Sequence, residues 1–181
     1  LPFRPKQTLH AYEQIWTKAG SPLIISTLKI KEKLIKKTGW HVEIAMRYED
    51  PSIELALTTL KSNGFNKVYV VPLYPHNAMA TTITTKVEVE RLAREIYPEA
   101  ELRFIKPFYK NEKYIKAISK GVRKYLSLHN FDKLIFSYHG IPKRQAKKTD
   151  ITGAHCFENN DCCEVESLGS NDCYKAHTVQ S

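Results

Sequence analysis

The stretch that decides the fold is KVYVVPLYPHNAMATTITTKVEVERLAREIYPEAELRFIK, residues 67–106. It begins with a short run rich in Val and Tyr, passes through a helical pattern at 82–96, and returns to a second apolar run at 101–106. A strand, a helix and a strand in this order are typical of a βαβ unit, in which the two strands lie parallel in one sheet.

The same alternation extends to both sides of this stretch. It predicts strands at 41–46, 67–74, 101–106 and 132–139, separated by helices at 52–62, 82–96 and 111–128. We therefore expect an α/β fold with a Rossmann-like, doubly wound parallel sheet. Two helices precede it, at 8–18 and from Pro22 onward, where Ser21 is the candidate cap.

The second of these helices has two chemically different faces. Apolar positions recur at helical spacing, and lysines occupy the remaining positions. The expected buried face is Leu23, Thr27, Ile30 and Leu34, and the lysines are Lys29, Lys31, Lys33, Lys36 and Lys37. The lysine run is typical of a solvated face, with a membrane-surface patch as the alternative.

Charge and composition restrict the function. Twenty-eight Lys and Arg against nineteen Asp and Glu give a net charge of +9, which favours acidic partners. No apolar run approaches the roughly 20 residues of a membrane-spanning helix, and no export signal is visible, so we expect a cytoplasmic location. Neither GxGxxG nor GxxxxGK[ST] occurs, which argues against the usual nucleotide sites.

Ligands of doubly wound sheets bind beyond the carboxyl ends of the strands. The residues that follow the predicted strands are polar and aromatic, and they suit a flat ligand with charged edges. His139 ends the last predicted strand before Gly140, where an imidazole can accept or release protons near neutral pH. The other candidates are Arg47, Tyr48, Tyr74, His76, Asn77, Tyr109 and Tyr138.

All four cysteines, Cys156, Cys162, Cys163 and Cys173, fall in one short segment. Four thiolates can hold a tetrahedral zinc or the two irons of a 2Fe-2S cluster. The adjacent pair Cys162 and Cys163 does not match the spacing of a zinc ribbon. An iron-sulfur cluster, zinc, free thiols and disulfides are the alternatives at this point.

Several segments together resemble ferrochelatases. FSYHGIPKR (136–144) followed by KKTDITGAHC (147–156) is similar to the signature region of that family. GSPLIISTLK (20–29), MRYEDPSI (46–53) and VPLYPHNAMATT (71–82) resemble three further family segments in the same order. His76, Asn77 and Ala78 depart from the family pattern, and His76 there is interpreted as an exposed loop residue.

The resemblance implies insertion of Fe2+ into protoporphyrin IX to form heme, with release of two protons. His139 would be the catalytic base and would contact the substrate iron, while Arg47, Tyr48, Tyr74 and Tyr138 would bind the porphyrin. Some bacterial ferrochelatases carry a four-cysteine segment with a 2Fe-2S cluster, which here would be the segment 155–175. Peripheral membrane contact is a further expectation, and no nucleic-acid partner is expected.

The resemblance also implies an incomplete copy of a two-half protein. Residues 1–130 would be the first Rossmann-like half without its N-terminal strand, and residues 131–181 the start of the second half. We therefore expect negligible chelatase activity from these residues alone. The alternatives are a cobalt or sirohydrochlorin chelatase and a non-enzymatic metal-cluster-binding module, and the oligomeric state stays open.

Overall fold

The computed structural model describes residues 4–128 and 130–181. The chain forms two compact units, residues 1–65 and residues 66–181, which we call the first and second units. None of the helices in the described part of the chain is long and apolar enough to cross a membrane. The division expected at residue 130 concerns the two halves of a longer protein and stays a prediction.

The first unit contains three helices, α1 (Arg4–Ile15), α2 (Pro22–Thr38) and α3 (Ile53–Ser62). Pro22 opens α2 as expected, although the Ser21 side chain makes no capping hydrogen bond, and Gly39 ends the helix at φ 69°. The Ser52 hydroxyl accepts a hydrogen bond from the backbone N–H of Leu55 at 3.0 Å. A cap of this kind stabilises a helix by about 0.5–2 kcal/mol, and α3 begins where the sequence predicts.

Two expectations for the first unit are wrong. Residues 41–46 form no strand, and the bridge between Met46 and Ser52 is an isolated one. Of the predicted apolar face of α2, Thr27 is buried, whereas Leu23, Ile30 and Leu34 are exposed. Thr27 can be buried because its hydroxyl donates to the carbonyl of Leu23 at 2.8 Å.

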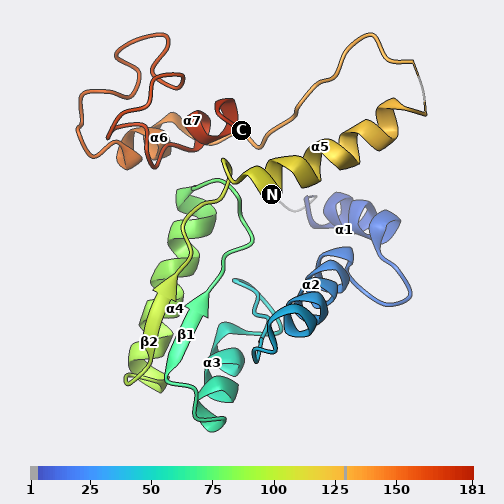
Figure 1. Cartoon of the computed structure of the whole chain (residues 1–181), viewed down its shortest axis with the longest axis vertical. Coiled ribbons are helices and arrows are strands. Elements are labelled where there is room, and N and C mark those ends of the chain that lie inside the picture. The colour runs from blue at the N-terminus through green and yellow to red at the C-terminus, as the bar shows by residue number, and fades with distance from the viewer. Residues whose placement is uncertain (1–3, 129) are drawn as a thin grey trace. The chain divides into compact units, whose positions relative to one another are not determined.

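The second unit is built on the βαβ pattern of residues 67–106 (Figure 1). Strands β1 (Lys67–Val70) and β2 (Glu101–Phe104) are parallel, with Lys67 opposite Glu101 and Val70 opposite Phe104. Between them lie the π-helical turn η1 (Met79–Ile83) and helix α4 (Thr84–Ile96). α4 lies along the strands and buries Val89 and Ala93. The expected parallel pairing is confirmed for these two strands.

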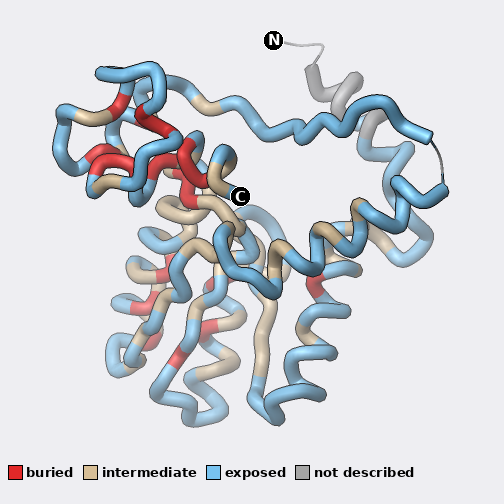
Figure 2. The backbone as a smooth tube through the Cα atoms, turned by 45° about the horizontal axis from the view of Figure 1, so that its top comes forward, coloured by how far each residue is buried: buried red, intermediate tan, exposed pale blue. Residues whose placement is uncertain are grey.

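The remaining helices are α5 (Glu112–Leu126), α6 (Lys143–Thr149) and α7 (Tyr174–Val179). Buried residues of the second unit gather around α4 and in the segment that carries the cysteines (Figure 2). The strand expected at 132–139 is not formed: the segment is extended but unpaired among the described residues, and Ile135 is 84% exposed. The structure is thus mixed α/β with a small parallel sheet, and its doubly wound character is not confirmed.

Candidate functional site

His139 lies in the extended segment between α5 and α6. Its side chain is exposed, and its neighbour Tyr138 is 44% exposed. Gly140 and Pro142 follow, and α6 begins directly after Pro142. The imidazole is therefore open to a ligand and is carried by a segment that has no strand pairing among the described residues.

A second imidazole lies in the turn that follows β1, residues 74–77, which we call the Tyr74 turn. The ring of His76 is surrounded by three tyrosine rings, with centroid distances of 6.3 Å to Tyr109, 5.6 Å to Tyr138 and 5.8 Å to Tyr174. His76 is half-buried, so its interpretation as an exposed loop residue is wrong. Burial and, secondarily, the neighbouring His177 lower the pKa of His76.

This ring cluster places two of the predicted site residues near the Tyr74 turn. Tyr138 packs edge-on against His76, and Tyr138 precedes His139 in the chain. Tyr74 itself is 37% exposed. The hydroxyls of Tyr138 and Ser181 lie 3.3 Å apart, and Ser181 Oγ is also 3.3 Å from His76 Nε2. The second unit therefore holds an imidazole and several phenols at the carboxyl end of β1.

Arg47 and Tyr48 belong to the first unit. The guanidinium carbon of Arg47 lies 4.7 Å from the centre of the Tyr48 ring, a cation–π arrangement. Tyr48 is 68% exposed, whereas Arg47 Nε is buried and has no hydrogen-bond partner among the described residues. A guanidinium nitrogen in this position is suited to an anionic ligand.

The four cysteines gather in one buried core, which we call the four-cysteine core. Cys156, Cys162, Cys163 and Cys173 are free thiols that pack with Ala146 and Ala176. The sulfur atoms of Cys162 and Cys163 are 3.7 Å apart. Burial, reinforced by the neighbouring thiols, raises the pKa of Cys156 and of Cys163 to about 11. Without a metal these two thiols are neutral at pH 7.

Asp150 holds the backbone of the residues that lead to Cys156. Its carboxylate accepts hydrogen bonds from the backbone N–H groups of His155 and Cys156 at 2.9 and 2.8 Å, and from Thr152. The Thr152 hydroxyl and these backbone donors lower the pKa of Asp150. His155 in turn donates from Nε2 to the carbonyl of Cys162 at 2.6 Å. Asp150 and His155 thus connect two of the cysteines.

Gly169 makes this arrangement possible by its lack of a side chain. A Cβ added there would lie 2.4 Å from His155 Cβ and 2.6 Å from Asp150 Oδ1. We expect Gly169→Ala to destabilise the protein by about 1–3 kcal/mol in urea unfolding, because a methyl group is forced into a filled space. Reaction of the cysteines with a thiol reagent should become faster, since His155 and Asp150 must move.

Gly121 provides the matched control for this substitution. It lies within α5, and a Cβ added there meets nothing within 4 Å. Gly121→Ala should leave the thiols shielded and raise the free energy of unfolding by about 0.5–1 kcal/mol. Equal stability and thiol reactivity in Gly169→Ala and the unmodified chain would contradict the close packing around Gly169.

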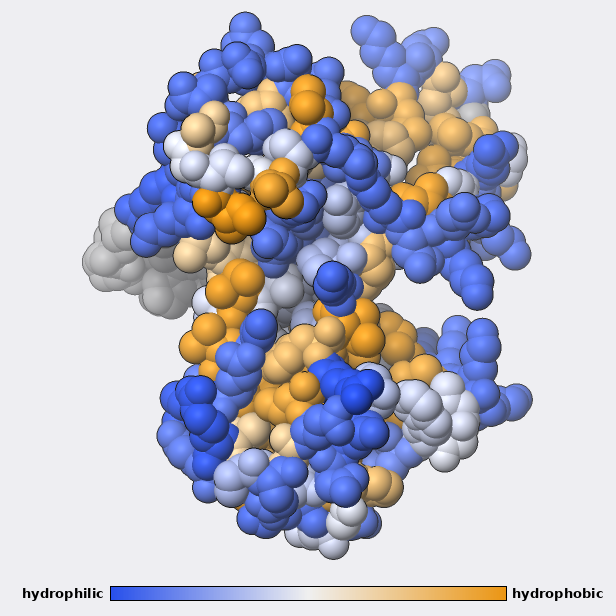
Figure 3. Space-filling view, turned by 60° about the vertical axis from the view of Figure 1, so that its left-hand side comes forward, coloured by the Kyte–Doolittle hydropathy of each residue, from blue (hydrophilic) through white to orange (hydrophobic). Residues whose placement is uncertain are grey.

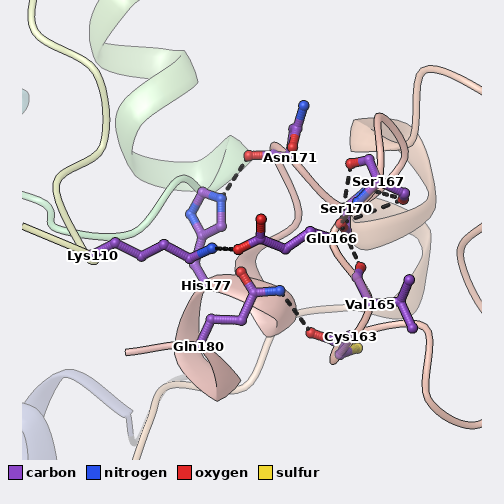
Figure 4. A network of polar contacts seen from close by, with 9 residues as sticks. All are labelled: Lys110, Cys163, Val165, Glu166, Ser167, Ser170, Asn171, His177 and Gln180. Atoms are coloured by element: carbon purple, nitrogen blue, oxygen red, sulfur yellow. Dashed lines mark hydrogen bonds and ion pairs between the residues drawn. The ribbon is translucent and has the colours of Figure 1, made fainter.

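The segment that carries the cysteines contacts residues that follow β1 and β2 in the chain. Lys110, six residues beyond β2, forms an ion pair with Glu166 (Figure 4). His177 is 1% exposed and stacks on Tyr109, with ring centres 3.8 Å apart. Gln180 donates to the carbonyl of Cys163 at 3.2 Å. The four-cysteine core and the carboxyl ends of the strands therefore belong to one packed arrangement.

The described side chains contain no group of three or more His, Cys, Asp or Glu that is arranged to hold a metal ion. Four soft sulfur donors are nevertheless buried together in the four-cysteine core, which is the donor chemistry that an iron-sulfur cluster would require. Two thiolates on one tetrahedral metal at about 2.3 Å are about 3.8 Å apart. The Cys162–Cys163 sulfur separation of 3.7 Å is close to that value.

The sequence alone assigns no role to two of the residues that join these features, Asp150 and His177. The signal for His177 was its spacing: it follows Cys173 by four residues, one helical turn, and in α7 its N–H donates to the Cys173 carbonyl at 3.0 Å. Its distant partner, Asn77, could not be inferred from local spacing.

Comparison with known proteins gives a consistent result. The family model for ferrochelatase matches residues 1–180. Ferrochelatases of Pseudomonas fluorescens (strain Pf0-1) and Stutzerimonas stutzeri are 38% and 39% identical to this chain, each over 98% of it and 52% of the relative. The ferrochelatase of Opitutus terrae is 39% identical over 97% of the chain and 51% of the relative. The chain spans about half the length of these relatives, and no solved structure matches it significantly.

Proposed function

Because the chain belongs to the ferrochelatase family, we propose that it is part of an enzyme that inserts Fe2+ into protoporphyrin IX and releases two protons. The observation that carries the proposal is the match over residues 1–180, which includes the segment around His139. Ferrochelatases are metal-inserting lyases, and the substrates proposed here are those of the whole enzyme.

The chemistry requires a base beside the porphyrin. Two pyrrole N–H groups must lose their protons before the ring can bind a divalent metal, and a histidine can accept protons at neutral pH. We assign this role, together with contact to the incoming iron, to His139, whose exposed imidazole can reach a ligand. Tyr74 and Tyr138 would contact the apolar ring.

Arg47 and Tyr48 are assigned to the porphyrin from the first unit. The ring of Tyr48 is exposed and can pack on a macrocycle, and the Arg47 guanidinium can pair with a propionate. The buried, unpartnered Nε of Arg47 supports an anionic ligand. The net charge of +9 favours acidic partners in general, and this assignment specifies a small molecule that carries carboxylates.

The four-cysteine core is proposed to hold a 2Fe-2S cluster. Cys156, Cys162, Cys163 and Cys173 would be its ligands, and loading would displace their thiol protons. Such a cluster supplies a one-electron redox couple when bound. Within this chain it would cross-link the start of α7 to the loops that carry Cys156, Cys162 and Cys163.

We propose a cytoplasmic location for the chain, with peripheral membrane contact through the surface of the first unit. Leu9, Trp16 and Leu23 are exposed, and α2 carries exposed lysines. In the second unit too, apolar side chains reach the surface among hydrophilic ones (Figure 3). We expect a larger fraction of the chain to sediment with anionic phosphatidylserine vesicles than with neutral vesicles. Trp16→Ser should lower the sedimented fraction with both kinds of vesicle. Equal, negligible sedimentation would contradict membrane contact.

Turnover tests the proposed function. The 181 residues would be joined to the remaining half of the P. fluorescens ferrochelatase, and heme formation from Fe2+ and protoporphyrin IX measured. Heme formation that requires both parts supports the proposal. Cobalt insertion into sirohydrochlorin instead would favour the alternative chelatase. A folded chimaera that shows neither of these two activities would contradict chelatase function.

A further inference from the structure

The Tyr74 turn is held from a distance by a residue that the proposed mechanism does not use. His177 lies in α7, and its Nδ1 is 3.0 Å from the backbone nitrogen of Asn77, a hundred residues away in sequence. The other ring nitrogen, Nε2, is 2.7 Å from the carbonyl oxygen of Asn171. Both imidazole nitrogens are therefore engaged with the backbone.

These partners define the protonation of the ring. A backbone N–H can only donate, so Nδ1 of His177 accepts from Asn77. A backbone carbonyl can only accept, so Nε2 carries the proton and donates to Asn171. Burial favours this neutral form by lowering the pKa of His177. The ring is thus a fixed connector that cannot also bind a metal through either nitrogen.

The connection fixes the part of the turn nearest the candidate site. The side-chain Nδ2 of Asn77 donates to the backbone carbonyl of Asp172 at 3.0 Å. Asn77 therefore makes two hydrogen bonds to residues in or next to α7, one from its backbone and one from its side chain. Asn77 is 3% exposed. Its neighbour His76 contacts the Tyr138 ring, and Tyr174, at the start of α7, contacts His76 as well. Loss of the His177 acceptor would leave a buried N–H unpaired beside these rings.

We propose that His177 is a positioning residue for the porphyrin site: its Nδ1 anchors the Asn77 backbone and thereby holds the Tyr74 turn, with His76 and Tyr138, in the conformation that binds the macrocycle. The proposal rests on the proposed function for the identity of the ligand. His177 itself touches no substrate. Because Cys173 is the N-cap residue of α7, the anchor also joins the four-cysteine core to the site.

Two substitutions separate the two ring nitrogens. His177→Asn keeps a polar atom near the Nδ1 position and can still accept from Asn77, whereas His177→Gln places its polar atoms near Nε2 and loses that acceptor. Amide hydrogen exchange at Asn77 should become about 10-fold faster in His177→Gln and stay near the unmodified rate in His177→Asn. Protoporphyrin IX fluorescence, measured with the chimaera that carries each variant, should show about 10-fold weaker binding for His177→Gln and about twofold or less for His177→Asn.

Several results would overturn the proposal. One is Asn77 exchange in His177→Gln as slow as in the unmodified chain; another is fast exchange with unchanged porphyrin affinity. Nitrogen NMR of the unmodified chain gives a test that needs no variant: a proton on Nδ1 rather than Nε2 of His177 contradicts the anchor. If the chimaera that carries the unmodified chain binds no porphyrin, the proposed function fails, while the exchange and NMR results still decide whether His177 holds the turn.

Discussion

Substitution of His139 by alanine is expected to lower heme formation by the active chimaera by about 10²–10⁴-fold. The imidazole is exposed next to Tyr138, and histidine is the side chain suited to accept protons from the porphyrin at neutral pH. Porphyrin affinity should change little, because the aromatic contacts assigned to Tyr74 and Tyr138 remain. The loss should therefore appear in kcat rather than in KM.

Added imidazole distinguishes a proton acceptor from a structural role. If His139 accepts protons, free imidazole should partly restore the rate of His139→Ala, because a small base can occupy the space left by the side chain. His41→Ala serves as the control, since His41 bonds Glu43 at 2.7 Å within the first unit. Full activity of His139→Ala would remove His139 from the mechanism, and an equal loss in His41→Ala would indicate a general effect on folding.

Local signals in the sequence predicted helices α1 to α5 and the central βαβ unit, but not α6 and α7. Ser52 caps α3, Pro22 opens α2, and the Asn111 side chain accepts from Lys113 and Tyr114 at the start of α5. Each of these signals acts within a few residues, so it can be read without knowledge of the rest of the chain. The strands β1 and β2 are likewise joined through one helix.

The strands predicted at 41–46 and 132–139 fail for a shared reason. A strand requires a hydrogen-bonded neighbour, and apolar residues such as Ile135 and Phe136 favour β structure without supplying one. Among the described residues no strand lies beside either segment. The residues of 132–139 therefore remain exposed and without regular secondary structure.

The candidate site was predictable in its residue types and unpredictable in its connections. His139 and the four cysteines stand out in the sequence by motif and by number. The contact of His177 with Asn77 and the ion pair of Lys110 with Glu166 join residues far apart in the chain. Such contacts depend on how the cysteine-bearing segment packs against the ends of the strands, which no local pattern encodes.

The second large effect concerns the four-cysteine core. Anaerobically purified chain, reconstituted with ferrous iron and sulfide, is expected to hold about two irons and two sulfides and to show visible absorption bands. Alanine at any one of Cys156, Cys162, Cys163 or Cys173 should abolish stoichiometric iron and sulfide, because each substitution removes one of the two cysteine ligands of an iron. Metal and sulfide analysis, together with the absorption spectrum, measures this loss.

The neutral state of the thiols adds a condition to this result. Since burial raises the pKa of Cys156 and Cys163 to about 11, cluster assembly must release protons, and the yield should fall as the pH is lowered. Val165→Ala is the matched control, because Val165 lies between Cys163 and Cys173 and is 48% exposed. It should keep the cluster. Stoichiometric zinc without iron, or a cluster that survives every cysteine substitution, would show that the four-cysteine core has another role.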